Sequence, residues 1–130
     1  MSISALYPPL TAFSAYGAGT QNTAHNLANV LTNNFKAGRV TYSELPENSG
    51  VRANGPQKLD VQGPLVPYGP GLPPLEGQNP AVPEGFAEGS TTDVGTEMVN
   101  LIVNSRTYQA NAKTVQTADD MLGTVINLKV

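Results

Sequence analysis

Apolar residues recur at steps of three and four along the C-terminal third of the chain, from Asp93 to Val130. This spacing predicts one long amphipathic helix with an apolar stripe on one face. A helix of that length, roughly 57 Å, cannot cover its own stripe. Ser90 and Asp93 form a capping-box pattern at its start. The predicted stripe comprises Val94, Met98, Leu101, Ile102, Tyr108, Val115 and Leu122.

A second stripe with the same spacing lies near the N-terminus, and it contains small residues at its centre. Its large members are Leu6, Leu10, Phe13, Leu27 and Leu31. Pro8 and Pro9 predict that the helix begins there, because proline is tolerated in a first turn. Asn33 and Asn34 predict its end near Thr32–Asn34, since asparagine accepts a left-handed cap. Two stripes at the two ends predict a mainly α fold in which the terminal helices pair as an antiparallel coiled coil.

The middle of the chain has a different character. Alternating residues predict a short strand over Gly38–Leu45 and a second over Lys58–Gln62, joined as a β-hairpin by turn residues. From Gly63 to Gly85, 12 of 23 residues are glycine or proline, which predicts irregular backbone. That segment fits either a flexible linker or an extended strap on a neighbouring surface. The expected organisation is a helical arm over 1–35, an insert over 36–88 and a long helix over 89–130.

Composition argues against catalysis and against several partner classes. The 130 residues include no cysteine and a single histidine, His25, so neither a catalytic triad nor a histidine metal site is expected. Asp119 and Asp120 diverge by about 100° on a helix and do not form an acid pair. A net charge of −3 disfavours nucleic acid. No apolar run is long enough to span a membrane, and no basic N-terminal region indicates a cleaved signal peptide.

Two groups of motifs resemble the terminal signatures of flagellar rod and hook axial proteins. The first is NLANV at residues 26–30, which continues to Phe35 and Lys36. The second comprises EMVNLI at 97–102, RTYQANAK at 106–113 and TADDML at 117–122. Asn34 stands where the family often carries glycine, and asparagine tolerates the same left-handed backbone.

This resemblance implies a structural subunit of the bacterial flagellar basal-body rod, with no cofactor. Such a subunit stacks helically with other copies and with other rod and hook axial proteins, transmits torque and forms the wall of the export channel. The resemblance also implies passage through the flagellar export apparatus into the periplasm-spanning rod without a cleaved signal, and no insertion into the membrane. The short chain resembles a proximal-rod subunit. The polar residues of the family motifs are Asn26, Asn29, Arg106, Gln109 and Asn111.

Two other functions remain open at this point. The chain fits a small soluble coiled-coil adaptor whose proline-rich strap binds a partner. It also fits an accessory axial protein of the hook or distal-rod type, because the C-terminal motifs lean toward that branch.

Overall fold

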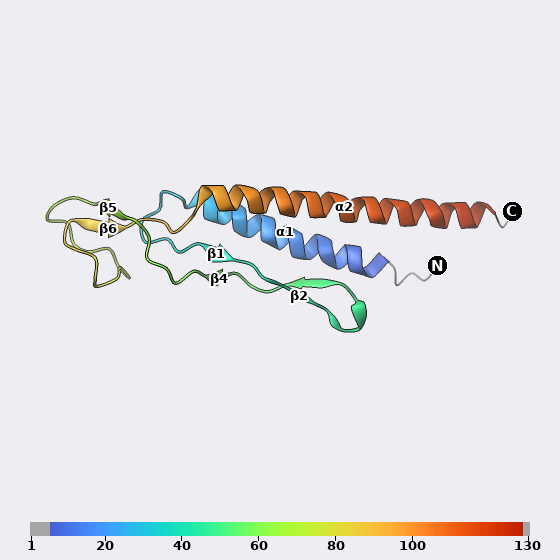
Figure 1. The fold of residues 1–130 in the computed structure, drawn as a ribbon, viewed down its shortest axis with the longest axis horizontal. Helices are drawn as coiled ribbons and strands as arrows, with labels where there is room; N and C mark the ends of the chain where they lie inside the picture. Colours follow the sequence, from blue (N-terminus) through green and yellow to red (C-terminus); the bar gives the residue numbers. More distant parts are fainter. Residues whose placement is uncertain (1–5, 129–130) are drawn as a thin grey trace.

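Two antiparallel helices form the long axis of the computed structural model, which describes residues 6–128 (Figure 1). α1 (Tyr7–Ala28) has 22 residues and α2 (Val94–Asn127) has 34. The two helices are aligned where α1 ends and α2 begins, so α2 extends past the start of α1 by about 18 Å. Both predicted helices are therefore present. The outermost residues of the predicted arms, 1–5 and 129–130, lie outside the described part of the chain.

The helix ends follow local chemistry. Prolines occupy the first turn of α1, as the sequence predicts. α1 ends at Ala28, a turn earlier than expected, and Asn34 then adopts the predicted left-handed conformation with a φ of 59°. α2 begins after Asp93, whose side chain accepts hydrogen bonds from the backbone N–H of Gly95 at 3.1 Å and from the Thr96 hydroxyl at 2.6 Å.

A β-hairpin is present over residues 38–58 and runs alongside α1, but only Lys58 of the predicted second strand belongs to it. Near its base, β1 (Gly38–Arg39) pairs with β4 (Gln57–Lys58). Farther out, β2 (Tyr42–Glu44) pairs with β3 (Val51–Ala53), and the short 3-10 turn η2 (Pro46–Asn48) joins them. Both pairs are antiparallel. The returning strands begin earlier than the predicted Lys58–Gln62, because the tight turn ends by Gly50.

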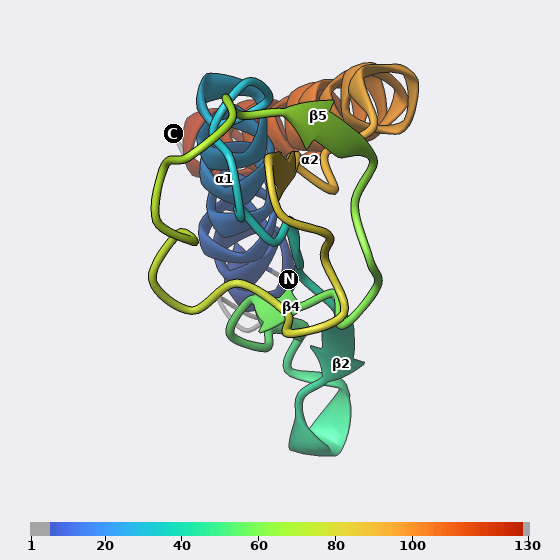
Figure 2. The same ribbon diagram turned by 90° about the vertical axis from the view of Figure 1, so that its left-hand side faces the viewer.

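The glycine- and proline-rich segment is folded back on itself. β5 (Leu65–Pro67) pairs antiparallel with β6 (Phe86–Glu88), so residues 68–85 form a closed loop. This loop lies at the end of the molecule opposite the C-terminal end of α2 (Figure 1), and that end faces the viewer in Figure 2. The expectation of irregular backbone throughout 63–85 is therefore wrong for the stretch that forms β5.

The predicted coiled coil is also wrong, and the chain is not a mainly α fold with a single hairpin. Residues 6–128 form two helices and three small antiparallel strand pairs. α1 contacts both α2 and β3, and its buried face is made of small and polar residues. Leu10 and Leu31 of the predicted stripe are instead 52% and 92% exposed. The buried face of α1 comprises Pro9, Ala12, Ala15, Gly19, Thr23 and Asn26.

The reason is steric. The buried row of α1 lies one residue before the predicted stripe, which is a rotation of about 100°. Small residues there allow the backbone of α1 to approach α2 and the hairpin at once. At Gly19, an added Cβ would lie 2.1 Å from the Tyr42 hydroxyl and 2.9 Å from Nδ2 of Asn104. The side chains of the predicted stripe are too large for that space, so many of them remain at the surface.

Candidate functional site

A polar junction joins α1, β1 and the first turn of α2, and Asn26 lies at its centre. The Asn26 side chain is fully buried and donates to the Gly38 carbonyl at 2.8 Å while accepting from the Gly38 N–H at 2.9 Å. It also donates to Oε1 of Glu97 at 2.8 Å. Asn22 donates to the same Gly38 carbonyl at 2.7 Å. One asparagine therefore fixes the hairpin and α2 relative to α1.

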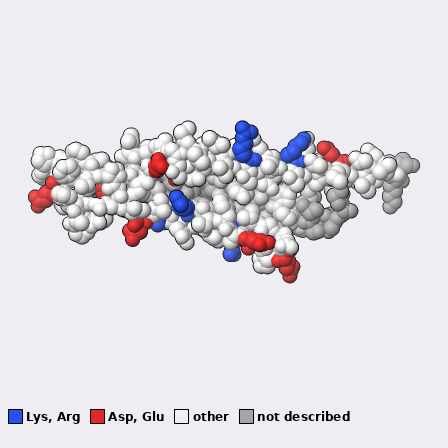
Figure 3. Space-filling view, in the orientation of Figure 1, with Lys and Arg blue, Asp and Glu red and all other residues white. Residues whose placement is uncertain are grey.

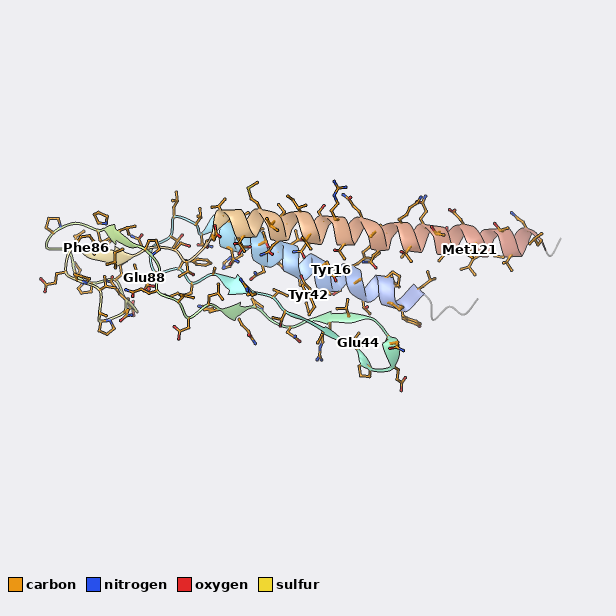
Figure 4. The ribbon with its side chains drawn as sticks, viewed as in Figure 1. Tyr16, Tyr42, Glu44, Phe86, Glu88 and Met121 are labelled. Carbon is orange, nitrogen blue, oxygen red and sulfur yellow. The ribbon has the colours of Figure 1, made fainter. Side chains whose placement is uncertain are left out.

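A second contact links the hairpin to α2 over Gly19. The Tyr42 hydroxyl donates to Oδ1 of Asn104 at 3.2 Å, and Tyr42 and Tyr16 face one another with ring centroids 4.9 Å apart (Figure 4). Burial, and then the nearby Tyr16 hydroxyl, raise the pKa of Tyr42 above its ordinary value. This bridge depends on Gly19, because any larger residue would displace the tyrosine.

A buried ion pair closes the base of the 68–85 loop. Glu88 is 1% exposed and accepts hydrogen bonds from the Lys36 ammonium and the Gly63 N–H (Figure 4). Lys36 also donates to the Val61 carbonyl at 2.6 Å. The hydrogen bond from Lys36, followed by that from Gly63, holds the pKa of Glu88 below its ordinary value. The carboxylate thus connects β6 to the segment before the hairpin through Lys36, and to the segment after it through Gly63.

The start of α2 is electrostatically reinforced. Hydrogen bonds from the Thr96 hydroxyl and then from the Gly95 N–H lower the pKa of Asp93. Ser90 does not cap the helix; its hydroxyl accepts from the Thr92 N–H at 3.1 Å within the preceding turn. An anionic cap at this position also interacts favourably with the helix dipole.

A groove of about 520 Å³ lies where α1, α2 and the hairpin meet. Glu97 lines it and is 7% exposed. Its Oε1 is bonded to Asn26, but no donor within residues 6–128 reaches its buried Oε2. Oε2 is therefore an unsatisfied acceptor within the groove. Burying a carboxylate oxygen without a hydrogen-bond donor costs free energy.

The face of α2 that points away from α1 is apolar and basic, and we call it the outer face. Met98, Val99 and Ile102 are 55%, 59% and 59% exposed there. Figure 3 shows basic side chains projecting from the edge of the molecule that α2 forms. Exposed apolar side chains clustered on one helix face indicate an interaction surface. The outer face comprises Met98, Val99, Ile102, Arg106, Gln109 and Lys113.

The residues of the two predicted stripes and of the family motifs are only partly brought together. Phe13 and Tyr108 pack with ring centroids 4.7 Å apart, which joins the two helices. Asn26 is the one fully buried member of the predicted set. Half-buried members are Leu6, Phe13, Leu27, Asn29, Asn111, Val115 and Leu122. Exposed members are Leu10, Leu31, Val94, Met98, Leu101, Ile102, Arg106, Tyr108 and Gln109.

Sequence reasoning missed most of the polar residues at the helix interface. Glu97 and Asn104 are seven residues apart, and Asn111 follows seven later, so the three share one face of α2. This polar row can be read from the sequence, but the apolar residues beside it form the clearer helical pattern. The residues missed at the contacts described above are Gly38, Tyr42, Glu88, Glu97 and Asn104.

Two further features bear on the kind of site this is. Within residues 6–128, no group of three or more His, Cys, Asp and Glu side chains is placed to hold a metal ion. Over the same range, neither helix combines the length and the apolar character needed to cross a bilayer.

Residues 84–128, which contain β6 and α2, match the family model described as "Flagellar basal body rod FlgEFG protein C-terminal". The chain is 47% identical over 45 residues to the flagellar hook protein FlgE of Escherichia coli (strain K12). That match covers 35% of this chain and 11% of the hook protein.

Two other relatives match longer stretches. The flagellar basal-body rod protein FlgG of Borreliella burgdorferi is 42% identical over 59 residues, which is 45% of this chain and 22% of that protein. The flagellar hook-basal body complex protein FlhP of Bacillus subtilis (strain 168) is 30% identical over 121 residues, which is 85% of this chain and 44% of that protein. The chain thus spans less than half the length of each relative.

Proposed function

The chain belongs to the family of flagellar basal-body rod and hook proteins, and on that premise we propose that it is a structural subunit of the basal-body rod. Proteins of this family are structural components of the flagellum. In the proposed role, copies of the chain associate with one another and with other axial proteins through their helices. The subunit then transmits torque and contributes to the wall of the export channel.

The exposed outer face of α2 is the observation that supports this role. A helix of 34 residues with Met98 and Ile102 more than half exposed does not bury its apolar side chains within one copy. Association with further copies removes this surface from water, at about 25 cal/mol per Å² of apolar area. The family match covers the same helix, so the matched segment and the exposed surface coincide.

A rod assignment is proposed over a hook assignment because the rod protein of Borreliella burgdorferi matches a longer stretch of this chain than the hook protein does. We also propose that the terminal helices are the assembly domain, that residues 36–88 are an insert, and that the chain passes through the flagellar export apparatus. The residues proposed to carry the contacts between copies are the exposed members of the predicted stripes.

Localisation tests the proposal. A chain carrying an epitope tag within the exposed loop, between Pro73 and Pro74, is expected in hook-basal bodies purified from the organism of origin. Its absence from basal bodies, with the tagged chain present in the cytoplasm, would contradict the rod assignment.

A loop deletion distinguishes the adaptor alternative. Replacing Gly69–Glu84 with an Asn-Gly turn keeps the β5–β6 pair, since the Tyr68 N–H already donates to the Gly85 carbonyl at 2.9 Å. A rod subunit that assembles through its helices retains incorporation and motility after this deletion. An adaptor that binds through its proline-rich strap loses its function.

A further inference from the structure

The groove and the outer face of α2 carry complementary charges on opposite sides of one helix. Glu97 and Arg106 are nine residues apart, which places them about 180° apart around α2. Glu97 faces the groove between α1 and the hairpin. Arg106 is exposed on the outer face, where Lys113 is the other basic residue. The two groups therefore cannot meet within one copy.

The Glu97 carboxylate lacks a hydrogen-bond donor, and the Arg106 guanidinium offers donors. Oε2 of Glu97 is enclosed without a donor from residues 6–128, whereas Arg106 has five N–H donors at the surface. Lys113 differs, because it already donates to Oε1 of Gln116 at 3.1 Å. A guanidinium beside a carboxylate forms short, charge-assisted hydrogen bonds, and such bonds are stronger when the pair is shielded from water.

We propose that Arg106 of one copy enters the groove of a second copy and donates to Glu97. This inference rests on the proposed function, because it names the contact through which copies assemble. In the contact, Met98 and Ile102 of the entering outer face cover the groove mouth and exclude water from the ion pair. Oε1 of Glu97 keeps its bond from Asn26, and Oε2 gains the donor that it lacks within one copy.

The contact is heterologous, and this follows from the same geometry. The donor and the acceptor occupy opposite faces of α2, so a copy whose groove is filled still presents a free Arg106. A contact of this kind does not close on itself in a dimer but repeats into a ring or a helical array. The geometry thus matches what an axial subunit requires.

Arg39 is the alternative donor within one copy. It lines the same groove and is exposed on β1, although no ion pair between it and Glu97 is present among the described residues. A pair in one copy contributes equally at every protein concentration. A pair between copies contributes only to assembly. The two cases are therefore separable by experiment.

A double-mutant cycle tests the proposal on the full chain. Glu97→Gln keeps the acceptor for Asn26, and Arg106→Gln removes the guanidinium but leaves a polar side chain, so neither substitution removes a contact described within one copy. We expect each single variant to raise the concentration at which half the protein sediments by about tenfold. The double variant is expected to reach half-sedimentation at a concentration no higher than that of either single variant. Lys113→Gln, on the same outer face, is the control and should shift this concentration less than threefold and independently of Glu97→Gln.

Cross-linking gives a second measurement that leaves both charged residues in place. The chain has no native cysteine, so chains carrying Asn100→Cys, which lines the groove, and Gln109→Cys, on the outer face beside Arg106, can be mixed and treated with a short bismaleimide. We expect a mixed cross-linked dimer, and a much weaker product when Asp120→Cys, farther along α2, replaces Gln109→Cys.

Three results would overturn the inference. Independent, multiplicative effects of Glu97→Gln and Arg106→Gln would show that the two residues do not interact. Coupling of Glu97→Gln to Arg39→Gln in the stability of the monomer would assign the donor to the same chain. Failure of the unmodified chain to assemble at any concentration would remove the proposed function as well, whereas assembly without coupling removes only this contact.

Discussion

At the scale of single residues, the molecule is held together by polar side chains in places where a coiled coil would have apolar ones. The fully buried Asn26 side chain makes three hydrogen bonds to two other elements. Its family motif could be read from the sequence, but its partners could not, because Gly38 and Glu97 become neighbours only through the tertiary fold. Buried polar groups specify one arrangement because each must find its own partner.

Asn26→Ala is expected to destabilise the fold by about 2–4 kcal/mol, because it leaves the Gly38 N–H and Oε1 of Glu97 without partners. Urea unfolding followed by far-UV circular dichroism measures this change. Asn33→Ala, at an exposed position, is the matched control and should change stability by less than about 0.5 kcal/mol. Equal effects of the two variants would contradict the role assigned to Asn26.

The glycines of α1 give a matched pair with opposite expected signs. Gly17 has no atom within 4 Å of an added Cβ, so Gly17→Ala should stabilise α1 by up to about 1 kcal/mol. Gly19→Ala should destabilise the fold, because the new methyl group displaces both Tyr42 and Asn104. Thermal unfolding of the two variants measures both effects, and stabilisation by Gly19→Ala would show that the Tyr42–Asn104 bridge is dispensable.

At the scale of elements, sequence patterns predicted both helices, the hairpin and the left-handed Asn34, because each depends on local chemistry. They failed on which face of each helix is buried. The apolar stripe marks a face that leaves water, but it does not say whether the cover comes from the same chain. Here Gly19 and Ala15 turn α1 toward its own α2 and hairpin, while Met98 and Ile102 stay exposed. The β5–β6 pair was missed because the prolines and glycines around it disfavour strands.

The 68–85 loop should open on acidification. Lys36 and the Gly63 N–H lower the pKa of Glu88 in the folded chain, so this stabilisation is complete above the ordinary carboxyl pKa of about 4.3 and is lost as the pH falls through the folded value. Hydrogen exchange of amides in β5 and β6 should accelerate below that pH relative to amides of α1. Glu88→Gln should remove most of the pH dependence, and an unchanged profile in that variant would assign the effect to another group.

At the scale of the whole molecule, the structure is elongated and has little apolar core. Among residues 6–128, the buried hydrophobic residues are all alanines, whereas many large apolar side chains of α2 are exposed. Such a chain gains stability when further copies cover α2, and its folding is then linked to its concentration. The central claim is therefore that α2 is chiefly an assembly element, and only secondarily a core helix.

The most direct test measures helix content and sedimentation of the full chain across a concentration series. We expect both to rise together, and Ile102→Asp on the outer face to shift the rise to at least tenfold higher concentration. Val61→Asp, at a side chain that is 58% exposed compared with 59% for Ile102, should leave it unchanged. Full, cooperative helicity in a monomer at every concentration, with no effect of Ile102→Asp, would contradict the claim.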